Sequence, residues 1–251
     1  MDDTPKAVQN PEGVESNRTF YDAESASYDQ RRLENPYKRY VNDRERAYLR
    51  RTLTGGTLLE VGAGTGRLTD VMVERVDRLV ATDLSAGMLA QLKAKVAAPT
   101  LQVVEIDVFR LPDLPDYGRF DWVVCMRVLP HLERYAEALR ILHDALAPGG
   151  QAIFDFWSAH SYTYYRKAKR HRKKKKTSGL YTHFVPGLAV AREIAAAGFG
   201  IEEWWSWGFP TPLGLRLEWL GRCPGIKRLG YSLIFRGRRA AAGASPGAAA
   251  S

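Results

Sequence analysis

A glycine-rich turn preceded by an acidic residue is the part of the sequence best suited to chemistry. A short apolar segment containing Glu60 leads into Gly-Ala-Gly-Thr-Gly at residues 62–66. Glycine tolerates the backbone angles of a tight turn and lets a ligand approach the main chain closely. The spacing is neither the G-x-G-x-x-G dinucleotide fingerprint nor a P-loop, which ends in Gly-Lys-Ser/Thr. The turn therefore favours an adenosine-containing cofactor other than NAD or ATP.

Two carboxylates follow the next two apolar segments. Asp83 lies 21 residues after Gly62, where a carboxylate above a parallel sheet can accept hydrogen bonds from ribose hydroxyls. Taken alone, Asp83 suits a helix N-cap equally well. Asp107 can accept from the exocyclic amine of adenine, although taken alone it is an ordinary loop residue. Asp121 opens the next apolar segment, and we interpret it as mainly structural.

The elements that must position these residues alternate between strand-like and helix-like patterns, which predicts a parallel sheet covered by helices. The first five strands are nearly continuous apolar runs, as expected where both faces of a sheet are covered. Strands are predicted at residues 57–61, 78–82, 101–106, 120–125, 150–156, 201–207 and 230–235. Helices are predicted at residues 40–51, 65–76, 85–96, 133–146 and 187–197, with Ser85 as an N-cap and Pro148-Gly149-Gly150 ending the fourth.

Composition excludes several classes of protein. The 251 residues are 45% hydrophobic and 26% charged, which is ordinary for a globular chain. There is no run of about 18 apolar residues and no apolar signal-peptide region, and two cysteines do not make a disulfide framework. A cytoplasmic location is expected, with the inner membrane face as a peripheral alternative. The net charge is +9, and residues 166–176 hold nine Lys or Arg and no acid, so the rest of the chain is nearly balanced.

The ordered motifs resemble the class I S-adenosylmethionine-dependent methyltransferases, in particular their small-molecule branch. Each motif is weak alone, but the five occur in the family's order at suitable separations, and the resemblance spans about residues 20 to 236. The motifs are Glu60-Val61-Gly62-Ala63-Gly64-Thr65-Gly66, then Thr82-Asp83-Leu84-Ser85-Ala86-Gly87-Met88-Leu89, then Asp107, then Phe120-Asp121-Trp122-Val123-Val124, then Leu146-Ala147-Pro148-Gly149-Gly150. The resemblance implies a doubly wound α/β fold. Its seven strands would have the order 3-2-1-4-5-7-6, with the last strand antiparallel and helices on both faces.

The resemblance also implies a set of residues that bind S-adenosyl-L-methionine. The glycine turn would pass under the methionine and ribose, Asp83 would bind the ribose, and Met88 would pack on the adenine. Tyr21 and Tyr28 belong to a lid over the donor, although simple helix packing explains them too, and Arg32 would reach its carboxylate. The complete expected set is Tyr21, Tyr28, Arg32, Glu60, Gly62, Gly64, Gly66, Asp83, Leu84, Met88, Asp107, Val108 and Met126.

Methyl transfer itself demands few catalytic groups, because a sulfonium methyl is already electrophilic and positioning supplies most of the rate. A hydroxyl or carbon acceptor often needs a general base. His131 is our catalytic candidate, although a helix-start residue is its plainer interpretation, and His160, His183 and Tyr181 are alternatives. No His or Cys spacing suits a metal, and no Asn-Pro-Pro-Tyr-like tetrad suited to base or amide nitrogens follows the fourth strand.

The predicted organisation is a disordered tail at 1–17, a methyltransferase domain at 18–238 and a low-complexity tail at 239–251. The domain would begin with lid helices at 18–53 and carry a basic insertion at 158–185. The expected acceptor is a small hydrophobic or amphipathic molecule, such as a quinone-like ring, a lipid headgroup or a secondary metabolite, methylated on O, N or C. The basic run Arg166–Lys176 could contact an anionic membrane or remain a solvated loop. Alternatives are an RNA or protein methyltransferase that docks through this run, and a non-catalytic cofactor-binding subunit.

Overall fold

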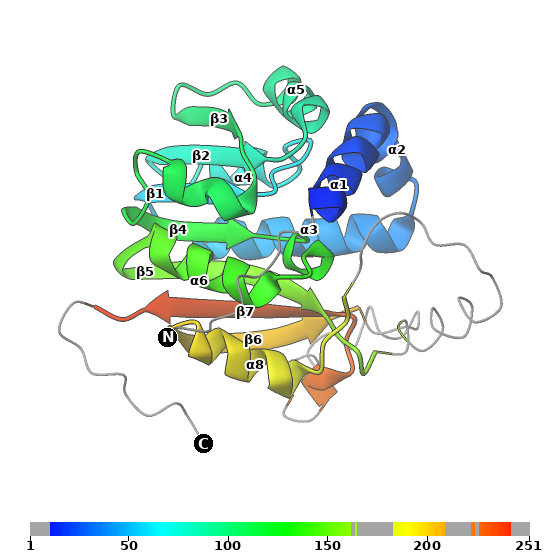
Figure 1. Ribbon diagram of the computed structural model, residues 1–251. Helices are drawn as coiled ribbons and strands as arrows, with labels where there is room; N and C mark the ends of the chain where they lie inside the picture. The colour runs from blue at the N-terminus through cyan, green and yellow to red at the C-terminus, as the bar shows by residue number, and fades with distance from the viewer. Residues whose placement is uncertain (1–10, 162–163, 165–182, 209–221, 224–225, 242–251) are drawn as a thin grey trace.

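The computed structural model places seven strands in a single sheet of order β3-β2-β1-β4-β5-β7-β6 (Figure 1). It describes residues 11–161, 164, 183–208, 222–223 and 226–241. Strand β7 runs antiparallel to β5 and β6, and the pairs formed by β1 to β5 are parallel. The predicted fold class and strand order are confirmed. The strands are β1 (Thr57–Val61), β2 (Arg78–Asp83), β3 (Leu101–Glu105), β4 (Phe120–Cys125), β5 (Leu146–Trp157), β6 (Phe199–Trp207) and β7 (Ser232–Arg239).

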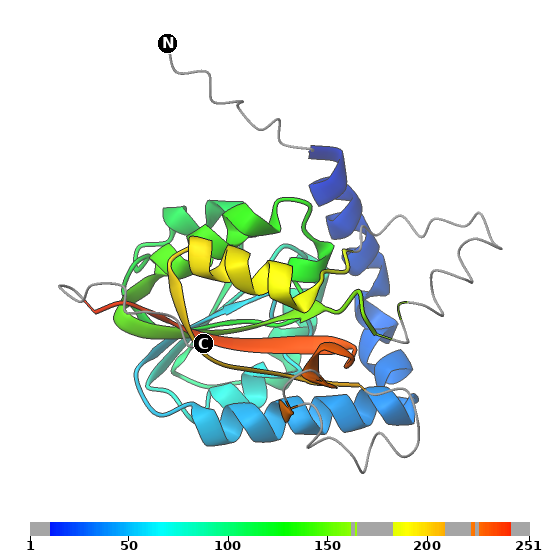
Figure 2. The same ribbon diagram turned by 90° about the horizontal axis from the view of Figure 1, so that it is seen from below.

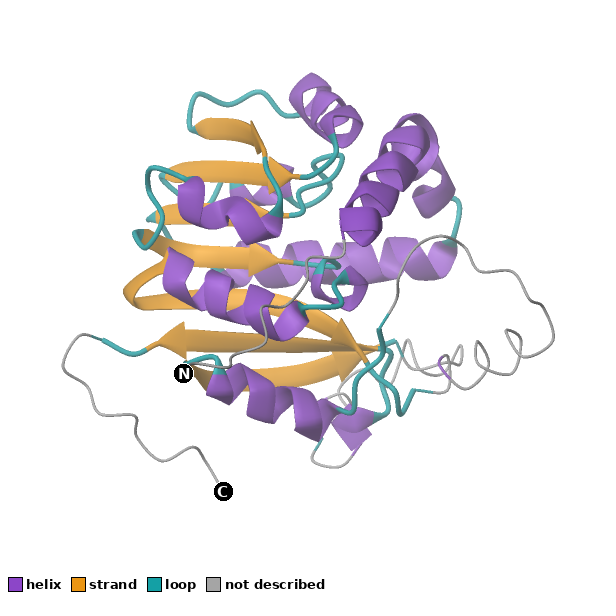
Figure 3. Cartoon of the chain, in the orientation of Figure 1, coloured by secondary structure: helices purple, strands orange, loops and turns teal. Residues whose placement is uncertain are grey.

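Helices cover both faces of this sheet, as Figures 2 and 3 show. The 3-10 helix η2 (Val108–Asp113), α6 (Tyr135–Ala145) and α8 (Gly187–Ala196) pack on one face. The other face carries α3 (Pro36–Thr52), α4 (Thr69–Met72) and α5 (Ala86–Lys95). Neighbouring residues of β1 show the division, since Leu58 packs with the α3 side and Leu59 with the α6 side. Burial on both faces explains the continuous apolar runs in the sequence.

The fifth strand begins earlier than predicted. Pro148-Gly149-Gly150 was expected to end a helix, but α6 stops at Ala145 and β5 starts at Leu146. The register with β4 shifts between Phe120 and Trp122, and Gly149 has a φ of +84°. A side chain at Gly150 would meet the carbonyl oxygen of Phe120 at 2.9 Å. The Pro-Gly-Gly segment is therefore an irregular stretch of the strand, where the two backbones approach closely.

The helix predicted at 65–76 is much shorter than expected. Only α4, Thr69–Met72, is α-helical. Gly66 has a φ of +82°, and its N–H donates to the carbonyl of Ala63 at 3.1 Å in a tight turn. A residue in the left-handed region cannot continue a right-handed helix, so the helix starts only after this turn.

The N-terminal segment forms helices that cross the carboxyl edge of the sheet. They are α1 (Pro11–Glu24), the 3-10 helix η1 (Ser25–Ser27) and α2 (Tyr28–Leu33), followed by α3. The disordered tail predicted at 1–17 is therefore wrong for residues 11–17, which belong to α1; residues 1–10 lie outside the described residues. Long-range contacts hold α1, since Asp22 Oδ1 accepts from the Gly87 N–H at 3.1 Å and from the Ser85 hydroxyl. Such contacts leave no local pattern in the sequence.

The remaining predicted segments fall largely outside the described residues. The basic insertion expected at 158–185 is described only at 158–161, 164 and 183–185, so the run Arg166–Lys176 is not among them. In the low-complexity tail expected at 239–251, residues 242–251 are outside as well. Within the described part of the chain, no helix has the length and apolar character needed to cross a membrane.

Candidate active site

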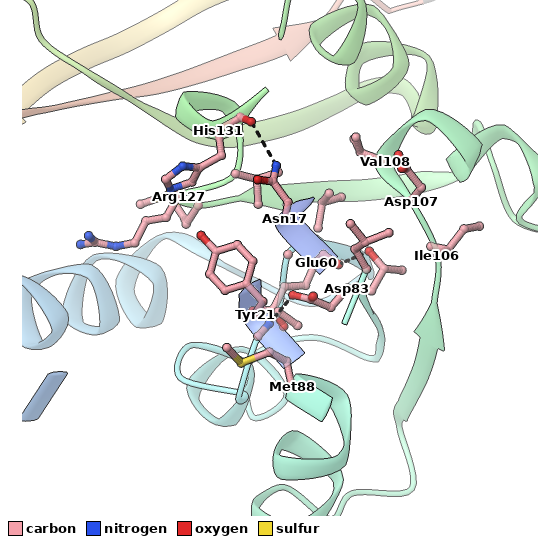
Figure 4. A pocket seen from close by; sticks show the side chains of 18 of the residues that line it. Asn17, Tyr21, Glu60, Asp83, Met88, Ile106, Asp107, Val108, Arg127 and His131 are labelled. Atoms are coloured by element: carbon pink, nitrogen blue, oxygen red, sulfur yellow. Dashed lines mark hydrogen bonds between the residues drawn. The ribbon is translucent and has the colours of Figure 1, made fainter. Parts of the chain in front are cut away.

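A cavity at the carboxyl ends of the parallel strands contains most of the predicted binding residues. It lies beneath α1, and its volume is about 150 Å³. Figure 4 shows Arg127 and Tyr21 on one side of it, with Ile106, Asp107 and Val108 on the other. The predicted residues that line the cavity are Tyr21, Tyr28, Glu60, Gly62, Gly64, Asp83, Leu84, Met88, Asp107, Val108, Met126 and His131. Gly66 and Arg32 are the two predicted binding residues that do not line it.

The first two glycines of the turn form the floor of the cavity. Gly62 and Gly64 have φ values of +75° and +57°. A side chain at Gly62 would meet Val128 Cγ2 at 2.1 Å, so a strand end and a loop approach each other closely there. A side chain at Gly64 would meet nothing within 4 Å, because it would point into open space. Gly66 instead packs against Leu92, whose Cγ would lie 3.0 Å from an added Cβ.

Asp83 is tied to the turn by hydrogen bonds to the main chain. Its Oδ2 accepts from the Gly64 N–H at 2.8 Å, and its Oδ1 accepts from the Ser85 N–H at 2.9 Å. Burial raises the pKa of Asp83, and the backbone N–H groups of Ser85, Gly64 and Leu84 oppose that rise. These bonds fix the carboxylate at the cavity wall, and each oxygen keeps lone-pair capacity for further donors. The N-cap interpretation and the ligand-binding interpretation of Asp83 are therefore compatible.

The wall next to Asp83 is mainly apolar. Met88 is buried at 2% exposure, and its N–H is capped by the Ser85 hydroxyl at 3.1 Å, which confirms the predicted N-cap of α5. Asp107 caps η2 by accepting from the Phe109 N–H at 2.8 Å. Val108 follows directly and is buried. A flat heterocycle would find an apolar wall and a carboxylate edge here.

Glu60 is a buried carboxylate behind the glycine turn. It is 3% exposed, and its Oε2 accepts from the Thr69 hydroxyl at 2.6 Å. Burial raises the pKa of Glu60 to about 7, although the bond from Thr69 and the charge of Arg67 oppose the rise. Glu60 connects the end of β1 to α4 while one side faces the cavity.

The lid over the cavity is built from α1 and α2. Tyr21 lies 6.3 Å from the His131 ring, and burial raises the pKa of its phenol. Asn17, one turn before Tyr21, donates to the His131 carbonyl at 3.5 Å. The Oδ1 of Asn17 is buried without a hydrogen-bond partner in the described part of the chain, although the residue lines the cavity. That unpaired acceptor is a place where a ligand donor would bind.

Arg32, which was expected to face the cofactor carboxylate, lies on the other side of Tyr28. Its Nη1 donates to the Tyr28 hydroxyl at 3.3 Å, and its side chain lines a separate hollow. Burial, together with Arg127 and Arg67, lowers the pKa of Arg32 to about 10. Arg32 does not line the cavity itself, but it contacts Tyr28, which does.

Sequence analysis missed a buried charge network behind the lid. Glu45 of α3 is 1% exposed and pairs with both Arg67 and Arg127. Burial alone would raise the pKa of Glu45, but Arg127, Arg67 and Arg32 hold it below its usual range. Glu45 and Arg127 are 82 residues apart in the sequence. The only signal that could have indicated them is a charged residue among apolar neighbours.

Arg127 is the centre of this network and a lining residue of the cavity. Its backbone is left-handed, with a φ of +66°, and its N–H donates to Asp155 Oδ1 at 2.5 Å. Asp155 is fully buried and also accepts from the Ser232 hydroxyl at 3.0 Å, which links β4, β5 and β7. A non-glycine residue in this conformation is uncommon and requires surrounding contacts to hold it. In Figure 4 the Arg127 side chain extends away from Asp107 and Val108.

His131 is the one predicted base that lines the cavity among the described candidates. It ends the 3-10 helix η3 (Leu129–His131), and its ring lies 5.1 Å from that of Trp157. His160 and His183 lie elsewhere, and Tyr181 is outside the described residues. Asp121 is structural, because its Oδ2 accepts from the Thr57 N–H at 2.7 Å. No group of His, Cys, Asp or Glu within the described ranges could hold a metal ion.

The residues that line the cavity suit the chemical groups of an S-adenosylmethionine-like ligand. The space above Gly64, the carboxylate of Asp83 and the unpaired Oδ1 of Asn17 all face the cavity. Together they offer close main-chain approach and acceptors for hydroxyl and ammonium donors. Met88 and Val108 offer the apolar wall that a purine needs.

Comparisons with known proteins agree with this geometry. Residues 59–154 match the family model described as "Methyltransferase domain". The chain is 33% identical over 106 residues to the ubiquinone biosynthesis O-methyltransferase of Pseudomonas paraeruginosa, covering 40% of this chain and 44% of that protein. It is also 33% identical over 122 residues to the chloroplastic magnesium protoporphyrin IX methyltransferase of Arabidopsis thaliana, covering 48% and 38%. The match therefore spans less than half the length of these relatives.

Solved structures share the fold over nearly the whole chain. The magnesium protoporphyrin IX methyltransferase of Synechocystis PCC 6803, solved with bound SAH, aligns with a TM-score of 0.64 at 19% identity, covering 89% of this chain and 98% of that one. The DhpI–SAH complex aligns with a TM-score of 0.66 at 19% identity, covering 92% and 99%. Residues 59–154 thus match a methyltransferase domain, and the chain shares the Rossmann-like fold of these solved structures.

Proposed function

We propose that the protein transfers the methyl group of S-adenosylmethionine to a small, hydrophobic or amphipathic acceptor. The single observation that carries this is the cavity at the carboxyl ends of β1 and β2, where the open space above Gly64 lies beside Asp83. The relatives' names support a ring-bearing acceptor, and the ubiquinone enzymes favour oxygen as the methylated atom.

We propose that the cofactor lies along the wall from the glycine turn to η2. Gly62 and Gly64 would lie under its methionine and ribose, Asp83 would accept from the ribose hydroxyls, and Met88 would pack on the adenine. Leu84, Asp107, Val108 and the backbone of Met126 would complete the site. When bound, the cofactor supplies an electrophilic sulfonium methyl group.

The lid residues would bury the reacting groups. The volume of about 150 Å³ is below the roughly 300–1,000 Å³ typical of pockets for drug-sized ligands. We therefore infer that α1 and Tyr21 move outward when the ligands enter and then close over them. Closure excludes water and orients the acceptor, which supplies most of the catalysis that methyl transfer requires.

We propose His131 as the general base for a hydroxyl acceptor. Its ring lies at the cavity between Tyr21 and Trp157, on the opposite side from Met88 (Figure 4). An imidazole there can take the proton that the hydroxyl releases as the carbon–oxygen bond forms. Replacement of His131 by Asn should lower kcat about 100-fold or more on a hydroxyl acceptor while S-adenosylhomocysteine binds as before.

Incubation with labelled methyl donor tests the activity. Catechol-like quinol precursors, porphyrin carboxylic acids, lipid extracts, RNA and protein are offered separately, with the His131→Asn variant as control. The proposal expects the wild type to label a small ring-bearing acceptor. The His131→Asn protein should not label this acceptor. Label confined to RNA or protein would contradict it and favour the macromolecular alternative. Cofactor binding without label in any fraction would favour a non-catalytic subunit.

We also propose peripheral binding to an anionic membrane through Arg166–Lys176, because nine cations without an acid attract anionic headgroups. This run lies outside the described residues. Neutralising Lys173 to Lys176 should reduce flotation with vesicles that contain phosphatidylglycerol. Unchanged flotation would contradict this contact.

A further inference from the structure

A basic hollow lies beside the glycine turn and is separate from the active-site cavity. It is formed by α2, the first half of α3, the end of the turn and the last turn of α5, and its volume is about 220 Å³. Thr65 and Arg67 line both spaces, so the turn forms a wall between them. The residues that line the basic hollow are Asp29, Arg32, Lys38, Arg39, Asn42, Arg46, Thr65, Gly66, Arg67, Asp70, Lys95 and Val96.

The lining carries a large excess of positive charge. It contains six Lys or Arg side chains against the two carboxylates of Asp29 and Asp70, which leaves four positive charges. Glu45 lies behind Arg67 and reduces the excess to three. These six cations come from three helices and a turn, and they repel one another. A bound anion would reduce this repulsion.

The two carboxylates are already used by the structure. Asp70 pairs with Arg46, and Asp29 pairs with Lys95 while its Oδ1 accepts from the Thr65 hydroxyl at 2.6 Å. These pairs neutralise two cations and fix the hollow's walls. Because Arg67 pairs with Glu45, the cations left without a described carboxylate partner are Arg32, Lys38 and Arg39.

Arg32 and the start of α3 supply the donors that remain. The Nε and Nη2 of Arg32 are buried and have no hydrogen-bond partner in the described part of the chain. Lys38 and Arg39 are exposed at the rim, in the first turn of α3, and form no ion pair with any described carboxylate. Buried N–H groups without an acceptor are costly, and a bound oxyanion would satisfy those of Arg32.

We propose that the basic hollow binds a phosphate or diphosphate group. A compact oxyanion with several charges matches the two unpaired donors of Arg32 and the two rim cations, since a guanidinium binds phosphate oxygens in a fork. The volume is below the roughly 300 Å³ at which pockets for drug-sized ligands begin, which suits the anionic group alone. The source is either a free phosphorylated molecule or a lipid headgroup.

Occupancy of the hollow would affect the active-site lid. Arg32 donates to the Tyr28 hydroxyl at 3.3 Å, and Tyr28 lines the active-site cavity. An anion that holds Arg32 in place would also hold Tyr28 over the cofactor. Binding of S-adenosylhomocysteine should therefore tighten in the presence of the anion, and by the same factor the anion should bind more tightly to the cofactor complex.

Calorimetric titration of the full chain with pyrophosphate tests the site without any assay of methyl transfer. The variant Lys38→Gln/Arg39→Gln removes two rim cations, and Arg50→Gln/Lys93→Gln removes two exposed cations outside the hollow. We expect one site in the wild type, about a tenfold or greater loss of affinity in the first variant and less than about a twofold change in the second. Equal losses in both variants would show unspecific attraction and overturn the proposal.

Two further measurements separate the remaining outcomes. Competition between pyrophosphate and S-adenosylhomocysteine would place the anion in the active-site cavity and overturn the proposal, whereas mutual tightening supports it. Flotation with vesicles that contain phosphatidylglycerol distinguishes the source. In another outcome, pyrophosphate shows no binding while flotation falls in Lys38→Gln/Arg39→Gln and not in Arg50→Gln/Lys93→Gln. In that case the hollow binds a lipid phosphate. If neither probe depends on the hollow, the proposal is wrong.

Discussion

The two halves of the carboxyl edge are organised in different ways. Around β1 and β2, the site is held by side-chain hydrogen bonds to the main chain, such as the bond between Asp83 and the N–H of Gly64. Around β4 and β5, it is held by buried charges that are distant in the sequence, such as Glu45 and Arg127. In the first half, a backbone turn borders open space where we propose that a ligand binds. In the second half, the buried charges pair with one another. This difference predicts that loss of the buried carboxylate in the second half acts on folding, whereas in the first half the positions that open onto the cavity act mainly on ligand binding.

The largest effect should follow removal of Glu45. The Glu45→Ala variant leaves Arg67 and Arg127 buried without their shared carboxylate, so the free energy of unfolding should fall by about 3–5 kcal/mol. Denaturant titration measures the loss, with Glu74→Gln, an exposed carboxylate of the same charge, as control. A change below about 1 kcal/mol would mean that the network is not a structural element.

Glu60 tests whether a residue in the first half also contributes to stability. Its pKa is raised to about 7 in the folded chain, so the folded state binds a proton more tightly than the unfolded state. Its contribution is fully present below about pH 4.5 and is lost as pH rises through about 7, a difference of roughly 3 kcal/mol. In Glu60→Gln the decline of the unfolding free energy across this window should be smaller by that amount. Parallel pH profiles for the two proteins would contradict the prediction.

The two glycines of the turn separate folding from binding within the first half. Gly62→Ala should destabilise the fold by about 2–4 kcal/mol, because its φ is +75° and its new methyl would meet Val128 Cγ2 at 2.1 Å. Gly64→Ala should cost only about 1–2 kcal/mol from its left-handed backbone, since the methyl would enter open space.

Ligand titration completes the glycine comparison. Gly64→Ala should weaken S-adenosylhomocysteine at least about tenfold, because the methyl occupies space that the ligand needs. The double variant Gly62→Ala/Val128→Ala should recover the steric part of the stability lost in Gly62→Ala. If Gly64→Ala binds the ligand as well as the wild type, the floor of the cofactor site lies elsewhere.

The same division explains what could be predicted from the sequence. The turn, Asp83 and the N-cap at Ser85 follow from local patterns, whereas the strand order was implied by the family resemblance. The length of α4 and the start of β5 were wrong in detail, because positive φ angles and a register shift depend on the neighbouring backbone. The network of Glu45, Arg127 and Asp155 was missed, because pairs separated by tens of residues leave no periodic signal.

The role of Arg32 as a ligand of the cofactor carboxylate stays a prediction. The motif context suggested a ligand of the cofactor carboxylate, but the side chain lies behind Tyr28 in the basic hollow. Three guanidinium groups, those of Arg32, Arg67 and Arg127, compete for one buried carboxylate, and Arg32 is the one without it. A sequence motif does not contain this long-range arrangement of charges.

Calorimetric titration with S-adenosylhomocysteine, carried out in parallel on the wild type and on Asp83→Asn, tests the central claim most directly. The substitution keeps the shape of the side chain and removes the charge that would accept from the ribose hydroxyls. One binding site in the wild type, weakened at least about tenfold in Asp83→Asn, is the predicted result. The melting temperature should also fall, because the amide nitrogen of Asn cannot accept from one of the two main-chain N–H groups that Asp83 binds. Equal affinity in both proteins, or no binding by the wild type, would contradict it.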